Sequence, residues 1–184
     1  MASDHITELR SAFPLSGSKI ELRPFTRNHV TTEYLDWLRD PEVLRFSNQR
    51  FKKHDQKFSL AYLQSFEKTK NLFLAIHLLA TGGFVGTVTA YFSAQHQTAD
   101  IGLMVGDKSV WGRGIGSDAW LTLMQLLMNS FKIRKITGGT ARSNSGMVRI
   151  MLKAGMLPDG VRVGQELVDG IPEDILYFAR FRHE

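Results

Sequence analysis

The chain has 184 residues, of which 43% are hydrophobic and 22% charged, a composition typical of one globular domain. It contains no cysteine, which excludes disulfides and cysteine nucleophiles. No two of its six histidines have the close spacing of a local metal-binding pair, so we expect no metal site. Apolar runs are too short to span a bilayer and the start lacks a signal-peptide pattern, so we expect a cytoplasmic protein that binds no membrane.

The net charge of +5 favours an anionic ligand, and the distribution of charge along the chain indicates where that ligand binds. Between Asp118 and Asp159 the chain has no acidic residue. The same window contains Lys132, Arg134, Lys135, Arg142, Arg149 and Lys153. Such a run can simply be a solvated surface. Because it begins beside a cluster of glycines, we interpret it as a site for a phosphate-bearing ligand.

Hydrophobic periodicity predicts alternating strands and helices after an N-terminal tether over residues 1–17. The predicted elements are a strand at 19–25, a helix at 30–38, a helix capped by Asp55, strands at 72–79, 84–92 and 99–105, a helix after the glycines, a strand at 133–140, a helix at 144–156 and final strands that include 174–182. This order predicts one α/β domain over residues 18–184, with a mixed sheet and no internal repeat.

Three helices have apolar rows that predict their buried faces. For the helix capped by Asp55 the predicted row is Phe58, Ala61, Tyr62, Ser65 and Phe66. For the helix after the glycines it is Ile115, Ala119, Leu123, Leu127 and Phe131. For the helix at 144–156 it is Val148, Met151 and Leu152, and Gly155 is predicted to end that helix.

The segment "WGRGIG", residues 111–116, places three glycines where a helix should begin, although glycine disfavours helix by about 1 kcal/mol. A helix N-terminus offers free amides to phosphate, and glycine lets the backbone approach the oxygens. A P-loop is excluded because the chain has no Gly-Lys pair. A dinucleotide fingerprint matches Gly114, Gly116 and Ala119 but lacks the acidic residue expected about 20 positions later.

"WGRGIG" after "IGLMVGDKSV" resembles the pyrophosphate loop of the GNAT superfamily of N-acyltransferases, Q/R-x-x-G-x-G/A, with Trp111 at the Gln/Arg position. The similarity continues in "PFTRNHVTTEYLDWLRDPEV", "GFVGTVTAYF" and "ARSNSGMVRIMLKAGM", and spans about residues 18–182. It implies the GNAT fold, a central mixed β-sheet with helices on both faces. It also implies an acetyl-CoA-dependent N-acetyltransferase in which an amine attacks the thioester directly.

The resemblance further implies how acetyl-CoA is held. The amides of Arg113, Gly114, Ile115, Gly116 and Ser117 would bind the pyrophosphate. The strand before the loop would bulge away from its neighbour, so that pantetheine pairs with its edge at Met104 and Val105, where an amide can also stabilise an oxyanion. Asn144 would bind the pantetheine arm or cap its helix, and Arg149 and Lys153, on one helical face, would reach the 3′-phosphate or lie in solvent.

The sequence offers three candidates for acid–base catalysis. The family's frequent tyrosine acid is replaced by Met151, which has no proton to donate, so Tyr177 is the substitute candidate. Asp100, on the same strand face as Gly102, is the candidate base, acting through water. His77 is a third candidate. For each of these three residues the alternative is a purely structural role in its predicted strand.

The acceptor is predicted to be a small-molecule amine or a peptide N-terminus. "YLDWLRDPEVLRFSNQRFKKH" resembles acetyltransferases of nucleotide-activated amino sugars, and its Arg45, Arg50, Lys52 and Lys53 would suit a sugar diphosphate. The alternatives are N-terminal acetylation of a ribosomal protein, as in the branch that shares "WGRGIG", and a catalytically silent acyl-CoA-binding module. No nucleic acid is expected, because the aromatic–basic interleaving of nucleic-acid binders is absent. A homodimer through the final strands is possible.

Overall fold

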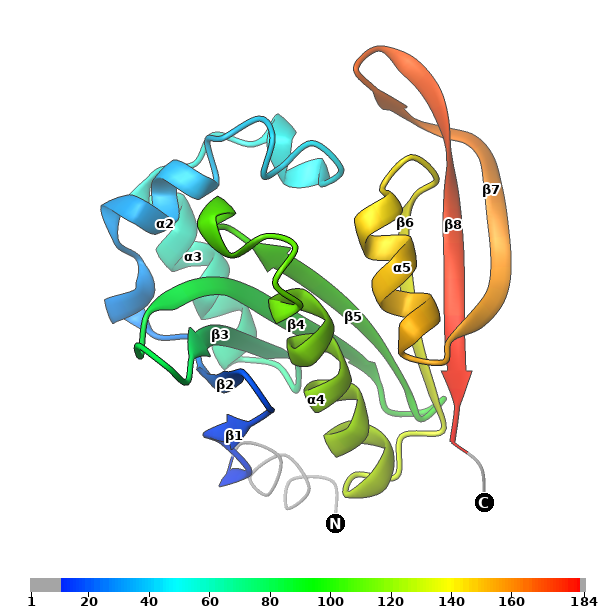
Figure 1. Ribbon diagram of the computed structural model, residues 1–184, viewed down its shortest axis with the longest axis horizontal. Helices are drawn as coiled ribbons and strands as arrows, with labels where there is room; N and C mark the ends of the chain where they lie inside the picture. The colour runs from blue at the N-terminus through cyan, green and yellow to red at the C-terminus, as the bar shows by residue number, and fades with distance from the viewer. Residues whose placement is uncertain (1–10, 183–184) are drawn as a thin grey trace.

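The computed structural model describes residues 11–182 and contains one continuous sheet with helices on both of its faces (Figure 1). The strands are β1 (Leu15–Ser16), β2 (Ile20–Pro24), β3 (Leu72–Leu78), β4 (Phe84–Ser93), β5 (Thr98–Val105), β6 (Lys135–Ala141), β7 (Leu157–Val168) and β8 (Ile171–Phe181). The α-helices are α2 (Thr32–Trp37), α3 (Gln56–Glu67), α4 (Ile115–Asn129) and α5 (Ser145–Lys153). Short 3-10 turns are η1 (Arg27–His29), η2 (Asn48–Phe51) and η3 (Lys108–Val110).

The sheet has the order β1-β2-β3-β4-β5-β6-β8-β7 and is antiparallel except between β5 and β6. The predicted mixed α/β sheet is therefore confirmed. The predicted tether differs in part. Its residues 1–10 lie outside the described residues, whereas Leu15 and Ser16 already pair with Leu22 and Glu21 of β2.

Two apolar cores lie on opposite faces of the sheet. Helices α4 and α5 cover one face, where Trp120, Leu123 and Leu127 are fully buried. Helices α2 and α3 cover the other face, where Tyr34, Trp37 and Phe66 pack against Phe73 of β3. Most of the predicted row on α4 is buried, but Leu152 on α5 is 51% exposed.

The predicted face of α3 is wrong in part. Its buried residues are Ser59, Leu63 and Phe66, while Ala61 and Ser65 are exposed. The cap is as predicted, because the Asp55 carboxylate accepts the amide of Phe58 at 2.8 Å. The helix is thus placed correctly in the sequence, but rotated about its axis so that a serine faces inward.

The parallel pairing of β5 and β6 is short, and this opens the sheet. The paired positions are Thr98 with Lys135, Ala99 with Ile136 and Asp100 with Thr137. Beyond them, β5 over 101–105 remains paired with β4 and β6 over 138–141 with β8, so two strand edges face each other without pairing. Within β5 the register against β4 is regular. Just past its end the amides of Gly106 and Asp107 both donate to the Val85 carbonyl, at 2.9 and 3.2 Å, which is the hydrogen-bond pattern of the predicted bulge. The opening lies where β5 and β6 diverge.

Helix α4 begins at this opening and is fixed to β2. The Asp118 carboxylate accepts the amides of Ser18, Lys19 and Ile20 at 3.2, 2.7 and 3.2 Å. Burial would raise the pKa of Asp118, but these hydrogen bonds outweigh it and hold the pKa below its usual value. The first turn of α4 is therefore anchored through a side chain, which leaves its own amides free.

Candidate active site

The first turn of α4 presents four amides without acceptors. Among the described residues, the N–H groups of Gly114, Ile115, Gly116 and Ser117 have no hydrogen-bond partner, and pairing resumes where Asp118 donates to the Gly114 carbonyl at 3.0 Å. Gly114 has φ +83°, a left-handed conformation that favours glycine. Free amides at the positive end of a 15-residue helix are suited to phosphate.

The glycines serve different purposes. Gly112 and Gly114 adopt positive φ. Gly116 instead lies at a point where the α4 backbone comes close to neighbouring side chains. A Cβ on Gly116 would lie 3.1 Å from both Leu103 Cδ2 of β5 and Ile150 Cδ1 of α5. Gly116 thus lets α4 pack directly against the edge of β5.

Arg113 and Trp111 shape the approach to these amides. The Arg113 amide donates to the Val110 carbonyl at 3.3 Å, so this one of the five predicted phosphate-binding amides is already used within the turn. The exposed Arg113 side chain remains a candidate phosphate contact. The Trp111 indole donates to the Val105 carbonyl at 2.8 Å, which ties the loop to the end of β5 and occupies one polar group of the edge predicted for pantetheine.

Of the residues predicted to bind the cofactor from α5, one caps the helix and two are exposed cations. Asn144 caps the helix, with Oδ1 accepting the Met147 amide at 3.2 Å and Nδ2 donating to Thr140 Oγ1 at 2.9 Å. The capping interpretation is therefore confirmed, and pantetheine binding by the same side chain stays a prediction. Arg149 and Lys153 are exposed, and neither has an ion-pair partner in the described part of the chain.

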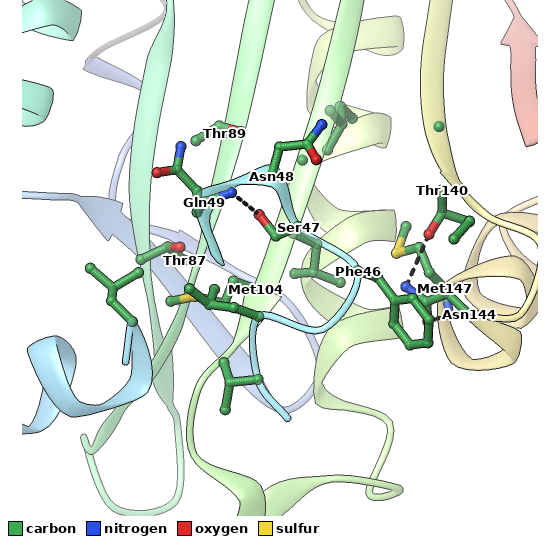
Figure 2. Close-up of a pocket in the computed structure, with 18 of the residues that line it drawn as sticks. Phe46, Ser47, Asn48, Gln49, Thr87, Thr89, Met104, Thr140, Asn144 and Met147 are labelled. Atoms are coloured by element: carbon green, nitrogen blue, oxygen red, sulfur yellow. Dashed lines mark hydrogen bonds between the residues drawn. The ribbon is translucent and has the colours of Figure 1, made fainter. Parts of the chain in front are cut away.

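A cavity of about 480 Å³ lies where β5 and β6 separate. Figure 2 shows Phe46, Ser47, Asn48 and Gln49 between Thr87, Thr89 and Met104 on one side and Thr140, Asn144 and Met147 on the other. Tyr34, Phe58, Tyr62 and Phe73 add an aromatic wall. Of the predicted residues, Asp100, Met104, Asn144 and Tyr177 line this cavity, whereas Val105, Arg113 to Ser117, Arg149 and Lys153 do not.

Asp100, the predicted base, lies where β5 and β6 separate. Its Oδ2 accepts the hydroxyl of Thr137 at 2.7 Å, across the last pair before β5 and β6 diverge. Burial of the carboxyl by the cavity wall raises its pKa, and the hydrogen bond from Thr137 offsets part of this rise. The residue is still exposed to water through the cavity. A carboxylate in this setting accepts a proton more readily than an ordinary aspartate.

Tyr177 of β8 also lines the cavity, with its ring over Gly139 of β6. A Cβ on Gly139 would lie 2.9 Å from Tyr177 Cε1. On the other neighbouring strand, β7, the Arg162 guanidinium lies 5.1 Å from the centroid of the Tyr177 ring. Met151 is fully buried under Gly138 and does not line the cavity. The α5 side chain that does line it is Met147, which has no proton to donate.

Three buried polar atoms of residues that line the cavity have no partner among the described residues. They are His54 Nδ1, Ser59 Oγ and Trp120 Nε1, and each residue is less than 9% exposed. His54 Nε2 donates to the Gln49 carbonyl at 2.7 Å, which leaves Nδ1 as an acceptor. Buried polar groups normally find a partner, so these atoms indicate that the cavity receives a polar ligand or water.

The basic residues predicted to hold a sugar diphosphate do something else. Arg45 donates to the Asp169 carboxylate at 3.0 and 2.8 Å, and Arg50 donates to the Leu167 carbonyl at 2.8 Å. Both bonds join the loop over 45–50 to the β7–β8 hairpin. Lys52 and Lys53 are exposed and do not line the cavity. Of its described lining residues, Asp100 and Glu166 are acidic and none is a lysine or arginine.

His77, the third candidate base, lies elsewhere. The Thr26 amide donates to His29 Nδ1 at 2.9 Å, His29 Nε2 lies 3.1 Å from His77 Nε2, and His77 Nδ1 lies 2.9 Å from the Gly82 carbonyl. This chain of bonds is complete only when both rings are neutral, with His29 donating to His77. His77 does not line the cavity, so the prediction that it is a base is wrong; it ties η1 to the β3–β4 turn.

The histidine pair predicts a loss of stability in mild acid. Burial, then the charge of His77 and that of Arg23, lower the pKa of His29 below 6.5. The unfolded chain therefore binds a proton more readily than the folded chain, so the free energy of unfolding falls as the pH drops below about 6.5. Urea unfolding at pH 8, 7, 6 and 5 measures this. His29→Gln should reduce the fall between pH 7 and 5, and an unchanged fall in that variant would contradict the assignment.

Known proteins share this architecture. Residues 19–157 match the family described as the acetyltransferase (GNAT) domain, which is most of the chain. The chain belongs to the GNAT acetyltransferase family. It is accordingly an acetyl-CoA-dependent N-acetyltransferase, which replaces the interpretation as a silent binding module.

This GNAT acetyltransferase is similar to the probable N-acetyltransferase YjcK of Bacillus subtilis, with 24% identity over 168 residues, 87% of this chain and 92% of YjcK. The structure of RimL, a ribosomal L7/L12 α-N-protein acetyltransferase in complex with CoA, has a TM-score of 0.79, 19% identity, and coverage of 91% and 96% of the two chains. Spermidine N-acetyltransferase from Vibrio cholerae, in complex with CoA and spermine, has a TM-score of 0.78, 13% identity, and coverage of 90% and 96%. RimL is thus described as acting on a ribosomal protein and the Vibrio cholerae enzyme as acting on spermidine, and neither is described as an amino-sugar acetyltransferase. In the described part of this chain no helix is long and apolar enough to cross a membrane.

Proposed function

We propose that this GNAT acetyltransferase transfers the acetyl group to the α-amine at the N-terminus of a protein, with ribosomal proteins as the first candidates. The observation that carries the proposal is the charge of the cavity. Asp100 and Glu166 suit a cationic amine, and the lack of lysine and arginine among the described lining residues disfavours a diphosphate. The fold shared with RimL supports the same class.

The residues at α4 and at the diverging strands fit acetyl-CoA. Four free amides and the Arg113 side chain would hold the pyrophosphate, with Arg149 and Lys153 nearby on α5 for a further phosphate. The unpaired edges of β5 and β6 would flank the amide-rich arm, which would pair with Val105 through its remaining polar group. The predicted backbone pairing at Met104 does not fit, because the antiparallel ladder turns its backbone toward β4. Asn144 stays a predicted contact to the same arm. When bound there, acetyl-CoA supplies a thioester as the electrophile.

The chain's own residues would then move protons. An α-amine has an ordinary pKa of about 8, so a base must remove a proton before the nitrogen can attack. Asp100 lines the cavity and is proposed to take this proton through water, with Thr137 holding the orientation of its carboxylate. Tyr177 is proposed to donate a proton to the leaving thiolate. Met104 and the aromatic wall keep bulk water away from the reacting amine.

A polyamine is the second candidate acceptor, because the Vibrio cholerae spermidine enzyme shares the fold and two carboxylates line the cavity. Glu166 is, however, already bonded to Asn48 Nδ2 at 2.9 Å, and much of the remaining wall is aromatic. Each of the two carboxylates thus already accepts one hydrogen bond, and a largely aromatic wall suits an acceptor with one charged amine better than one with several, which favours the protein N-terminus. An amino-sugar nucleotide, the acceptor predicted from the sequence, is not proposed, because no lysine or arginine among the described lining residues is there to hold its diphosphate.

An acceptor panel tests the proposal. The panel contains a peptide with a free N-terminal serine or alanine and an internal lysine, the same peptide with a blocked N-terminus, spermidine and a nucleotide-activated amino sugar. Thiol release and product mass are measured with acetyl-CoA. We expect turnover on the free peptide and none on the blocked one, which separates the α-amine from the lysine side chain. Turnover on spermidine or the amino sugar but not on the free peptide would contradict the proposal.

A homodimer stays a prediction. Strand β7 ends the sheet, and with β8 it exposes apolar side chains, with Leu157, Val163 and Ile171 at 72%, 84% and 66%. An exposed edge strand with such side chains favours association. Analytical ultracentrifugation with Val163→Lys, compared with the unchanged chain, measures this.

A further inference from the structure

We infer that the indole N–H of Trp120 donates a hydrogen bond to the acyl-pantetheine arm of acetyl-CoA. Trp120 is fully buried, yet it lines the cavity, and its Nε1 has no partner among the described residues. A buried N–H without an acceptor costs about 1–3 kcal/mol of unfolding free energy. A donor kept at that cost beside a ligand site indicates an acceptor supplied by the ligand.

The position of the ring supports this role. Thr137 is the last residue of β6 that pairs with β5, and Gly138 is the next residue. A Cβ on Gly138 would lie 2.7 Å from Trp120 Cη2 and 3.0 Å from Cζ2, so the indole lies against β6 where the strands separate. Cζ2 is next to the carbon that bears Nε1. The polar edge of the indole is therefore close to the opening.

The α4 helix relates this donor to the phosphate site. Gly116 precedes Trp120 by four residues, so both lie on one side of α4. A Cβ on Gly116 would lie 3.1 Å from Leu103 and 3.5 Å from Val105, so this side of α4 faces β5. The four free amides lie at the start of this helix, about one turn, or roughly 5 Å, from Trp120. An arm that leaves a pyrophosphate on these amides and enters the opening between β5 and β6 would pass the indole. Its carbonyl oxygens are the acceptors that the N–H requires.

The inference rests on the proposed acyl-CoA site, and two ligands separate the two claims. CoA contains the arm, whereas 3′,5′-ADP has phosphates but no arm. Trp120→Phe removes the donor and keeps most of the ring, and calorimetry measures both dissociation constants. We expect a five- to tenfold weaker affinity for CoA and an unchanged affinity for 3′,5′-ADP. Equal affinities of the variant and the unchanged chain for CoA would overturn the inference. If the unchanged chain binds neither ligand, the acyl-CoA site itself is wrong.

Nuclear magnetic resonance tests the same bond without a variant that must fold. The chain has three tryptophans, so its ¹H–¹⁵N spectrum should contain three indole signals. The signal of Trp120 should move downfield when CoA binds and stay in place with 3′,5′-ADP. Trp37, in the core on the opposite face of the sheet, provides the internal reference. A Trp120 signal that does not respond to CoA, or responds equally to 3′,5′-ADP, would overturn the inference.

Discussion

Asp100→Asn should lower kcat/KM by about two to four orders of magnitude while CoA binds as before, because a positioned base contributes about that much. The substitution keeps the size of the side chain but removes its capacity to take a proton. Asp100 lines the cavity, whereas the four free amides of α4 do not, so CoA affinity is the matched control within the same protein. Loss of CoA binding together with activity would instead point to a misfolded site.

The pH dependence of kcat/KM distinguishes a role of Asp100 as a base from a purely structural role. Burial raises the pKa of Asp100 above 3.8, and kcat/KM should fall as the pH drops through this raised pKa, because the protonated carboxyl accepts no proton. Thr137→Val removes the hydrogen bond that lowers this pKa. We therefore expect its acid limb at higher pH, with activity at alkaline pH nearly unchanged. An acid limb that does not move in Thr137→Val and persists in Asp100→Asn would contradict the assignment.

Ser117→Asp should abolish most CoA binding and leave the fold intact. The new carboxylate would lie in the first turn of α4, among the free amides, where it repels the pyrophosphate and competes for its donors. Like charges about 4 Å apart cost about 1–4 kcal/mol between bulk water and a protein surface, so we expect a roughly 100-fold higher dissociation constant. Calorimetry with CoA measures this change.

The control for this variant is Ser117→Asn, which has a similar size and no charge. An acidic residue in the first turn of a helix stabilises it by about 0.3–1 kcal/mol, so the melting temperature of Ser117→Asp should stay the same or rise. Gly116 is less suitable, because a Cβ there already meets Leu103 and Ile150 at 3.1 Å. Unchanged CoA affinity in folded Ser117→Asp would show that phosphate does not bind these amides.

Local patterns predicted much of the architecture. The apolar runs of β3 to β5, the Asp55 cap and the glycines before α4 each reflect a constraint that acts within a few residues of the chain. The inward face of α3 could not be read in this way. Ser59 is buried there because it faces a cavity that Phe73 and Thr87 build from distant strands, and tertiary surroundings override helical apolarity.

In the candidate site, too, the residues of local motifs were predicted, whereas the residues fixed by distant parts of the chain were not. Gly114 and Gly116 were predicted from a contiguous motif, and the structure gives each a physical reason. The loop over 45–50 was misread, because its arginines are used by Asp169 and Leu167, which are more than 100 residues away in the sequence. Trp120 was missed altogether. An apolar helix row gives no sign that one indole N–H lacks an acceptor, since this depends on where β5 and β6 separate.

The most direct test of the central claim is the crystal structure of this enzyme with acetyl-CoA. We expect the pyrophosphate on the amides of residues 114–117 and the arm between β5 over 101–105 and β6 over 138–141. We also expect the thioester in the cavity beside Asp100 and Tyr177. A cofactor bound on another face of the sheet, or an arm that does not enter between β5 and β6, would contradict the proposed acetyl-CoA site.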